Sequence, residues 1–139
     1  MAAPNFYFGI NATFRYIQQR YGREGLHAYW RAMAREYFAN VIEHFAKGGL
    51  EAVEEYWQEF FEAEPGGEVS VRREGSEVII EVKQCPAITY LKAKKRKIMD
   101  LYCEHCDVIN KEMAEAAGLE FQMNGGNGSC GQVFSRKEG

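Results

Sequence analysis

The chain contains 139 residues, 46% of them hydrophobic, and its 17 basic and 20 acidic side chains leave a formal net charge of −3. This length fits a single domain, residues 1–139, that can bury a core without disulfides, and the acidic balance excludes the overall electrostatic footprint of a nucleic-acid-binding protein. No apolar run approaches the ~20 residues that cross a bilayer, and the start of the chain is too short and too polar for a secretory signal; we therefore expect a cytoplasmic protein with reduced thiols and no membrane partner.

Apolar spacing predicts that the first half of the chain, residues 1–64, is helical. A first helix covers about 5–21 and ends at Gly22. A second and longer helix carries its apolar stripe over 26–45 and ends at a glycine pair, and a third covers 50–63. The stripes are wide and aromatic, which is typical of helix faces that pack on a sheet.

The second half, residues 65–139, carries all four cysteines and mixes strands with helix. The sequence predicts a hairpin over 69–74 and 78–82, a turn or short helix over 87–91, a helix over about 99–117, and strands over 119–123 and 132–134. Together the two halves predict an α+β domain in which an N-terminal helical half and one cysteine-bearing helix cover a small antiparallel sheet of about four strands.

The motif Cys103-Glu104-His105-Cys106 lies at the start of the last predicted helix. Helical spacing places Cys103, Cys106, Asp107 and Asn110 on one face, whereas His105 points away from it and is expected to be exposed. If the helix begins near residue 102, both thiols lie in its first turn, where the helix dipole favours thiolate. Thiol, carboxylate and carboxamide therefore share a polar stripe that indicates the wall of a pocket.

The cysteines allow several interpretations, which the sequence leaves open. A closed zinc site needs four ligands, but one CxxC with two isolated cysteines is not the usual zinc-ribbon spacing. A thioredoxin-type redox pair would need a strand directly before the motif, and buried free cysteines also serve as small hydrophobic residues. The cofactor is thus expected to be none or zinc. The four ligands of the zinc alternative are Cys85, Cys103, Cys106 and Cys130, with His105 able to replace one of them.

Two further stretches have unusual composition. Residues 124–131 contain four glycines but lack the phosphate-loop pattern, so they are interpreted first as a hairpin connection between the last two strands and second as an anion site. Residues 92–97 contain five basic side chains, which we interpret as a solvated surface loop.

Five short segments of the second half form a recognisable set: Cys85-Pro86, Tyr102-Cys103, Cys106-Asp107, Ala116-Ala117-Gly118-Leu119 and Gly128-Ser129-Cys130 leading into Phe134. Together they resemble the L-2-amino-thiazoline-4-carboxylic acid hydrolase family, which is similar to vinyl-4-reductase-type ligand-binding domains. The resemblance is specific over residues 85–136. It implies a small-molecule hydrolase that opens a C–N bond of a cyclic amidine or related small polar ring through a cysteine-lined pocket.

Under this hydrolase hypothesis the residues of the polar stripe receive chemical roles. Cys103 or Cys106 is the expected nucleophile or metal ligand, and Asp107 is the expected base or orienting group. Asn110 and Cys130 are expected to contact the substrate. Arg15, on the polar edge of the first helix, is a candidate partner for a substrate carboxylate, although a surface arginine would look the same.

Two other functions remain open at this stage. One is a non-enzymatic ligand sensor or binding module in which a zinc ion held by cysteines stiffens the pocket. The other is an interaction protein that works through Lys94 to Lys97, whose binding would weaken steeply with salt. The expected partner is a small molecule, without nucleic acid or membrane, and a homodimer is compatible with the chain.

Overall fold

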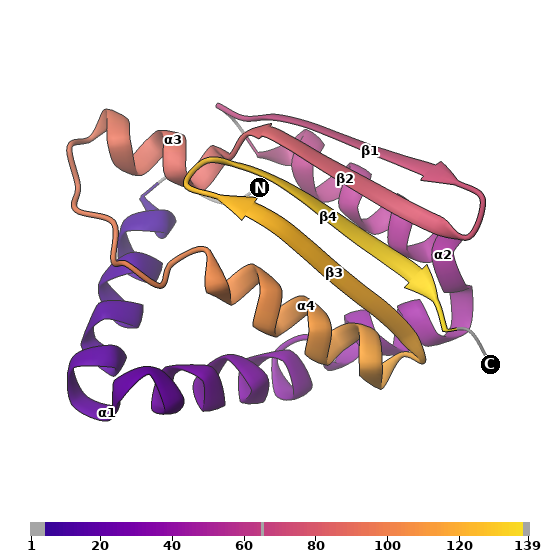
Figure 1. Cartoon of the computed structure of the whole chain (residues 1–139), viewed down its shortest axis with the longest axis horizontal. Coiled ribbons are helices and arrows are strands. Elements are labelled where there is room, and N and C mark those ends of the chain that lie inside the picture. Colours follow the sequence, from indigo (N-terminus) through magenta and orange to yellow (C-terminus); the bar gives the residue numbers. More distant parts are fainter. Residues whose placement is uncertain (1–4, 65, 138–139) are drawn as a thin grey trace.

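The computed structural model describes residues 5–64 and 66–137 (Figure 1). These residues form four helices and a four-stranded antiparallel sheet, which confirms the predicted α+β class. In chain order the elements are α1 (Phe6–Glu36), α2 (Ala39–Ala63), β1 (Glu68–Glu74), β2 (Glu77–Gln84), α3 (Pro86–Ala93), α4 (Glu104–Ala116), β3 (Leu119–Gly126) and β4 (Ser129–Arg136).

Both long helices bend at a glycine with positive φ. Gly22 has φ 73° inside α1 and Gly49 has φ 62° inside α2, a conformation that glycine adopts without the steric cost of a Cβ. The predicted helix breaks at these glycines are therefore confirmed. The prediction of one continuous helix over 26–45 is wrong, because the chain turns at Tyr37 and Phe38. The backbone N–H groups of both residues donate to the carbonyl of Met33.

The strands follow the order β1-β2-β4-β3, so that two hairpins lie side by side with β2 paired to β4. The β3–β4 hairpin closes at Asn127 and Gly128, with φ values of 58° and 112°. Two positive φ values in a two-residue connection are typical of a type I′ turn, for which Asn-Gly is a preferred pair. The glycine-rich stretch is thus the predicted hairpin connection, although most of it lies within the two strands.

The cysteine-bearing helix is shorter than predicted. Residues 100–103 form turns, and α4 begins at Glu104 with Cys103 as its N-cap residue. The segment left as a turn or short helix is α3, which begins at Pro86, where the missing N–H of proline costs no hydrogen bond. Cys85 and Cys103 therefore each precede the first turn of a helix.

One face of the sheet carries the core. Phe134 of β4 is fully buried, and its ring lies within 4.8–6.3 Å of the rings of Phe45, Trp57 and Phe121. Helix α2 packs over β1, β2 and β4, and α4 packs beside β3. The expectation that all the aromatic helices cover the sheet needs correction, because α1 packs mainly on α4, α3 and α2 (Figure 1). Helix α4 is consequently enclosed between the sheet and α1.

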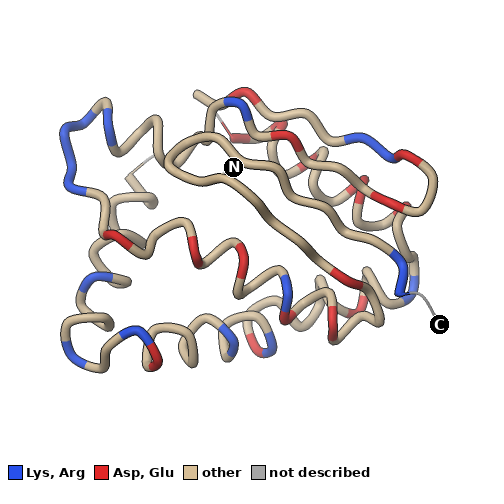
Figure 2. The backbone as a smooth tube through the Cα atoms, viewed as in Figure 1, with Lys and Arg blue, Asp and Glu red and all other residues tan. Residues whose placement is uncertain are grey.

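Charged residues are distributed along the helices, the strands and their connections (Figure 2), and Glu64 is the single Lys, Arg, Asp or Glu among the described residues that is buried. Residues 92–97 are all exposed, and Figure 2 shows the basic positions among them where α3 passes into the connection to α4. The guanidinium of Arg96 lies 4.4 Å from the ring centre of Phe8. Among the described residues, no helix combines the length and the apolar character that crossing a membrane requires.

Candidate functional site

A cavity of about 310 Å³ lies between the sheet and the helices, and all four cysteines line it. Its wall is mostly apolar and aromatic, with side chains from all four helices and from β2, β3 and β4. Such composition and size are typical of sites for small molecules. Three of the lining aromatic residues, Phe6, Tyr37 and Phe60, are 59%, 74% and 40% exposed and lie where the cavity meets solvent.

The β3–β4 turn brings the cysteines together. The N–H of Cys85 donates to the carbonyl of Gly128 at 2.8 Å, and the N–H of Asn127 donates to Sγ of Cys103 at 3.4 Å. Cys130 follows the same turn in β4 and pairs with Val82 of β2. The tight turn therefore sits against the starts of α3 and α4, which explains why residues far apart in sequence share one wall.

Cys106 and His105 form a thiol–imidazole pair in the first turn of α4. Nε2 of His105 lies 3.7 Å from Sγ of Cys106, and Nδ1 contacts the carbonyl oxygen of Tyr102. A carbonyl can only accept, so Nδ1 carries the proton and Nε2 is left with its lone pair toward the thiol. Sγ of Cys106, the imidazole of His105 and the carbonyl of Tyr102 are thus arranged as a nucleophile, a base and a group that orients the base.

The expectation that His105 is exposed is wrong. Its ring lines the cavity and packs against the rings of Phe14, Trp30 and Tyr102, with centre distances of 5.2, 6.2 and 4.9 Å. The physical reason is α1, which covers the side of α4 that faces away from the sheet. A helical wheel of α4 alone cannot show that α1 packs on this side of the helix.

Burial governs the titration of the site. It raises the pKa of the Cys106 thiol to about 12, with a smaller contribution from the Asp107 carboxylate, and the pKa of Cys85 to about 11. Burial also raises the pKa values of Cys103 and Cys130, and it lowers the pKa of His105. At neutral pH the cavity therefore holds neutral thiols and a neutral imidazole. This result runs against the expectation that the helix dipole would favour thiolate.

A chain of side-chain hydrogen bonds runs along the cavity wall between α4 and β4. Asn110, which is 4% exposed, donates from Nδ2 to Oε1 of Gln132 at 3.2 Å, and Nε2 of Gln132 donates to Sγ of Cys130 at 3.4 Å. All three residues line the cavity. Gln132 was not singled out from the sequence, although it shares the inward face of β4 with Cys130 and Phe134.

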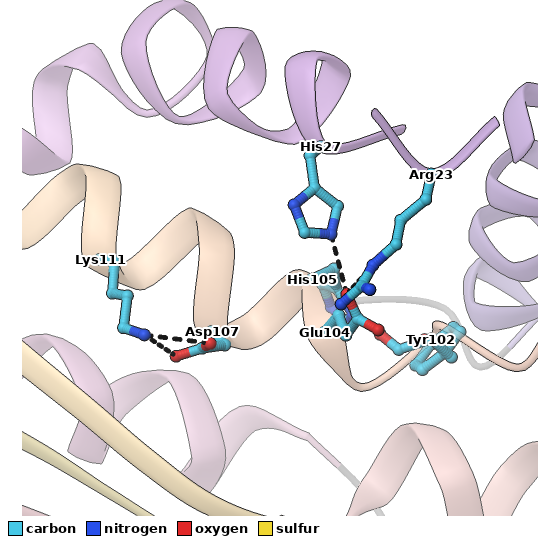
Figure 3. Close-up of polar contacts among 7 residues, drawn as sticks. All are labelled: Arg23, His27, Tyr102, Glu104, His105, Asp107 and Lys111. Carbon is cyan, nitrogen blue, oxygen red and sulfur yellow. Dashed lines mark hydrogen bonds and ion pairs between the residues drawn. The ribbon is translucent and has the colours of Figure 1, made fainter. Parts of the chain in front are cut away.

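Two residues assigned chemical roles from the sequence lie outside the cavity. Asp107 points toward Lys111, whose ammonium lies 3.2 Å from both carboxylate oxygens (Figure 3). Arg15 donates to the carbonyl of Lys97 at 3.3 Å. Neither residue is part of the cavity lining.

A charged cluster holds the start of α4 against α1. Oε1 of Glu104, within the CxxC motif, lies 2.9 Å from a guanidinium nitrogen of Arg23 and 2.8 Å from Nε2 of His27 (Figure 3). Arg23 directly follows the bend at Gly22. The cluster therefore connects the bend of α1 to the turn that carries Cys106 and His105.

A buried carboxylate also lines the cavity and was missed in the sequence. Glu64 is 9% exposed at the C-terminal end of α2, and the hydroxyl of Tyr7 donates to its Oε2. Burial and the Glu64 carboxylate both raise the pKa of Tyr7, so its hydroxyl keeps its proton. The available signal was spacing: Glu64 follows Phe61 by three and Trp57 by seven positions, on the apolar face of the helix.

The zinc alternative finds no matching geometry. Over residues 5–64 and 66–137, no group of three or more histidine, cysteine, aspartate or glutamate side chains is arranged to hold a metal ion.

Comparison of the chain with protein-family models, with curated proteins and with solved structures finds no match. The site must therefore be interpreted from its own residues.

Proposed function

We propose that this domain is a small-molecule hydrolase that binds a cyclic amidine in the aromatic cavity and opens one of its C–N bonds with the Cys106 thiol. The observation that carries the proposal is the Cys106–His105 pair, with 3.7 Å between Sγ and Nε2, at the wall of a cavity large enough for one small ring. The sequence resemblance to the thiazoline carboxylic acid hydrolase family supports the same chemistry.

In the proposed reaction, Sγ of Cys106 bonds to the amidine carbon while its proton moves to Nε2 of His105. The C–N bond then breaks, and the leaving nitrogen takes that proton from Nε2. Water attacks the carbon attached to sulfur, with Nε2 accepting a proton from the water and returning it to the departing sulfur. One water is consumed, an amide and an amine are formed, and the thiol is restored. His105 replaces Asp107 as the base, because Asp107 is engaged with Lys111.

The test is turnover of 2-amino-2-thiazoline and its 4-carboxylate, followed by mass spectrometry. We expect Cys106→Ala to abolish turnover, and His105→Gln to lower it by about 10²- to 10⁴-fold, the usual contribution of a general base. His44→Gln, at an exposed position of α2, is the matched control and should leave turnover unchanged. Turnover that survives Cys106→Ala would exclude Cys106 as the nucleophile.

A second candidate is a ligand-binding module without catalysis, which is favoured by the neutral state of all four thiols. It predicts saturable binding of an amidine without any product. Metal analysis of the purified protein separates the zinc version of this candidate, which requires one zinc per chain, from a metal-free one.

A further inference from the structure

The charge of the cavity wall is one-sided. Among the described residues that line the cavity, Glu64 is the single Asp, Glu, Lys or Arg side chain. A ligand carboxylate would thus meet one negative group and no Lys or Arg side chain in this part of the wall. Arg15, the arginine that the sequence suggested for a carboxylate, lies elsewhere.

The Glu64 carboxylate is short of positive charge. Its one side-chain hydrogen bond within the described chain comes from Tyr7, a neutral donor, and no described ion pair includes Glu64. A carboxylate in an apolar wall is costly unless a cation or several donors compensate it. A bound cation would supply that compensation.

Aromatic rings stand next to this carboxylate. Trp57 and Phe61, on the same face of α2, stack with ring centres 5.8 Å apart and 30° between their planes, and both line the cavity with Tyr7. Ring faces carry partial negative charge and attract organic cations, most strongly when water is excluded. The same rings give an anion no comparable attraction.

We propose that Glu64 and the rings of Tyr7, Trp57 and Phe61 form a subsite for a protonated amidine, so that the ligand of this cavity is a planar organic cation without a carboxylate. The choice of an amidine rests on the proposed function, whereas the cationic character rests on the cavity wall alone. This subsite departs from the amino acid derivative that the family resemblance implies. It makes charge, more than ring shape, the main determinant of specificity.

The test compares three probes of nearly equal shape by calorimetry: benzamidine, benzamide and benzoate. We expect benzamidine to bind about ten- to a hundredfold more tightly than benzamide, the usual gain from a charge-assisted contact, and benzoate to bind more weakly than both. Glu64→Gln should reduce the benzamidine affinity to that of benzamide. Glu62→Gln, an exposed position in the same turn of α2, is the matched control and should keep the preference.

A second variant keeps the proposal testable if the Glu64→Gln protein does not fold. Tyr7→Phe removes the hydroxyl that occupies Glu64 but leaves the carboxylate and the ring, so benzamidine should bind at least as tightly as to the parent protein. Benzoate binding as tightly as benzamidine, or a Glu64→Gln protein that is folded and keeps its preference, would overturn the subsite. Cation binding without turnover of any amidine would refute the hydrolase proposal and leave the subsite standing.

Discussion

The reactivity of Cys106 toward an alkylating reagent gives the sharpest test of its environment. With a pKa of about 12, Cys106 is thiolate in only about one molecule in 10⁵ at pH 7, against about 3% for an ordinary thiol with a pKa of about 8.5. The more basic thiolate is intrinsically about 40-fold more nucleophilic, since reactivity rises with pKa with a Brønsted slope of about 0.4–0.5. Together these two effects predict that Cys106 is alkylated at pH 7 about a hundredfold more slowly than an ordinary thiol such as that of glutathione.

The assay is timed iodoacetamide labelling from pH 7 to pH 11, followed by unfolding, labelling with an isotopic reagent and mass spectrometry of the peptide that contains Cys106. The rate should rise about tenfold per pH unit, because the thiolate fraction does so below the pKa. Steric protection alone would lower the rate at every pH and leave an ordinary plateau near pH 9. A plateau near pH 9, or an alkylation rate near that of glutathione at pH 7, would refute the raised pKa of the Cys106 thiol.

Asp107→Asn provides the matched variant for this experiment. The Asp107 carboxylate contributes to the raised pKa of Cys106 but does not line the cavity. Its removal should lower the pKa and speed labelling at a given pH below the plateau, while access to the thiol stays the same. Slower labelling would show that Asp107 acts on Cys106 through structure and not through charge.

Three further predictions concern stability. The free energy of unfolding should decline below about pH 6.5, because folding lowers the pKa of His105 and the unfolded chain binds the proton more tightly. It should decline again from about pH 9 toward pH 11–12, because folding raises the thiol pKa values. Urea titrations across this pH range check both declines, and a flat profile would contradict them. Phe134→Ala should cost about 3–5 kcal/mol in urea unfolding, since a fully buried ring is lost among three others, and a cost below about 1 kcal/mol would contradict the packing. Glu64→Gln should keep or raise the melting temperature, because it removes a buried negative charge from a helix C-terminus while an acceptor for Tyr7 remains, and a large drop would show that Glu64 holds the fold.

Local patterns were sufficient for most of the fold. Strand alternation identified the first hairpin, and Gly22 and Gly49 marked real bends because each adopts a backbone conformation with positive φ. The turn at Tyr37 and Phe38 escaped notice because the apolar stripe continues through it, so periodicity carries no signal of the break. The start of α4 was placed too early for a similar reason: residues 99–101 are largely apolar without being helical.

The candidate site was less accessible to sequence reasoning, because its walls come from separate elements. The cysteines could be recognised as a group by composition alone. His105 could not be assigned to the cavity without knowing that α1 covers α4. Glu64 lies more than 20 positions before the first cysteine and needed the fold to bring α2 beside α3 and α4.

The charge of the ligand and the state of the thiol are linked in the proposed chemistry. A unit positive charge at about 5 Å and an effective dielectric constant of about 20 stabilises a thiolate by about 3 kcal/mol, which lowers the thiol pKa by about two. A cationic substrate would therefore activate Cys106 in a cavity that otherwise keeps it neutral. Acetamidine, with acetamide as the uncharged control, should shift the ultraviolet thiolate titration of the parent protein to lower pH and leave the remaining thiolate signal of Cys106→Ala much less changed. An equal shift in both proteins would place the cation away from Cys106, and the nucleophile would then have to be sought among the other three thiols.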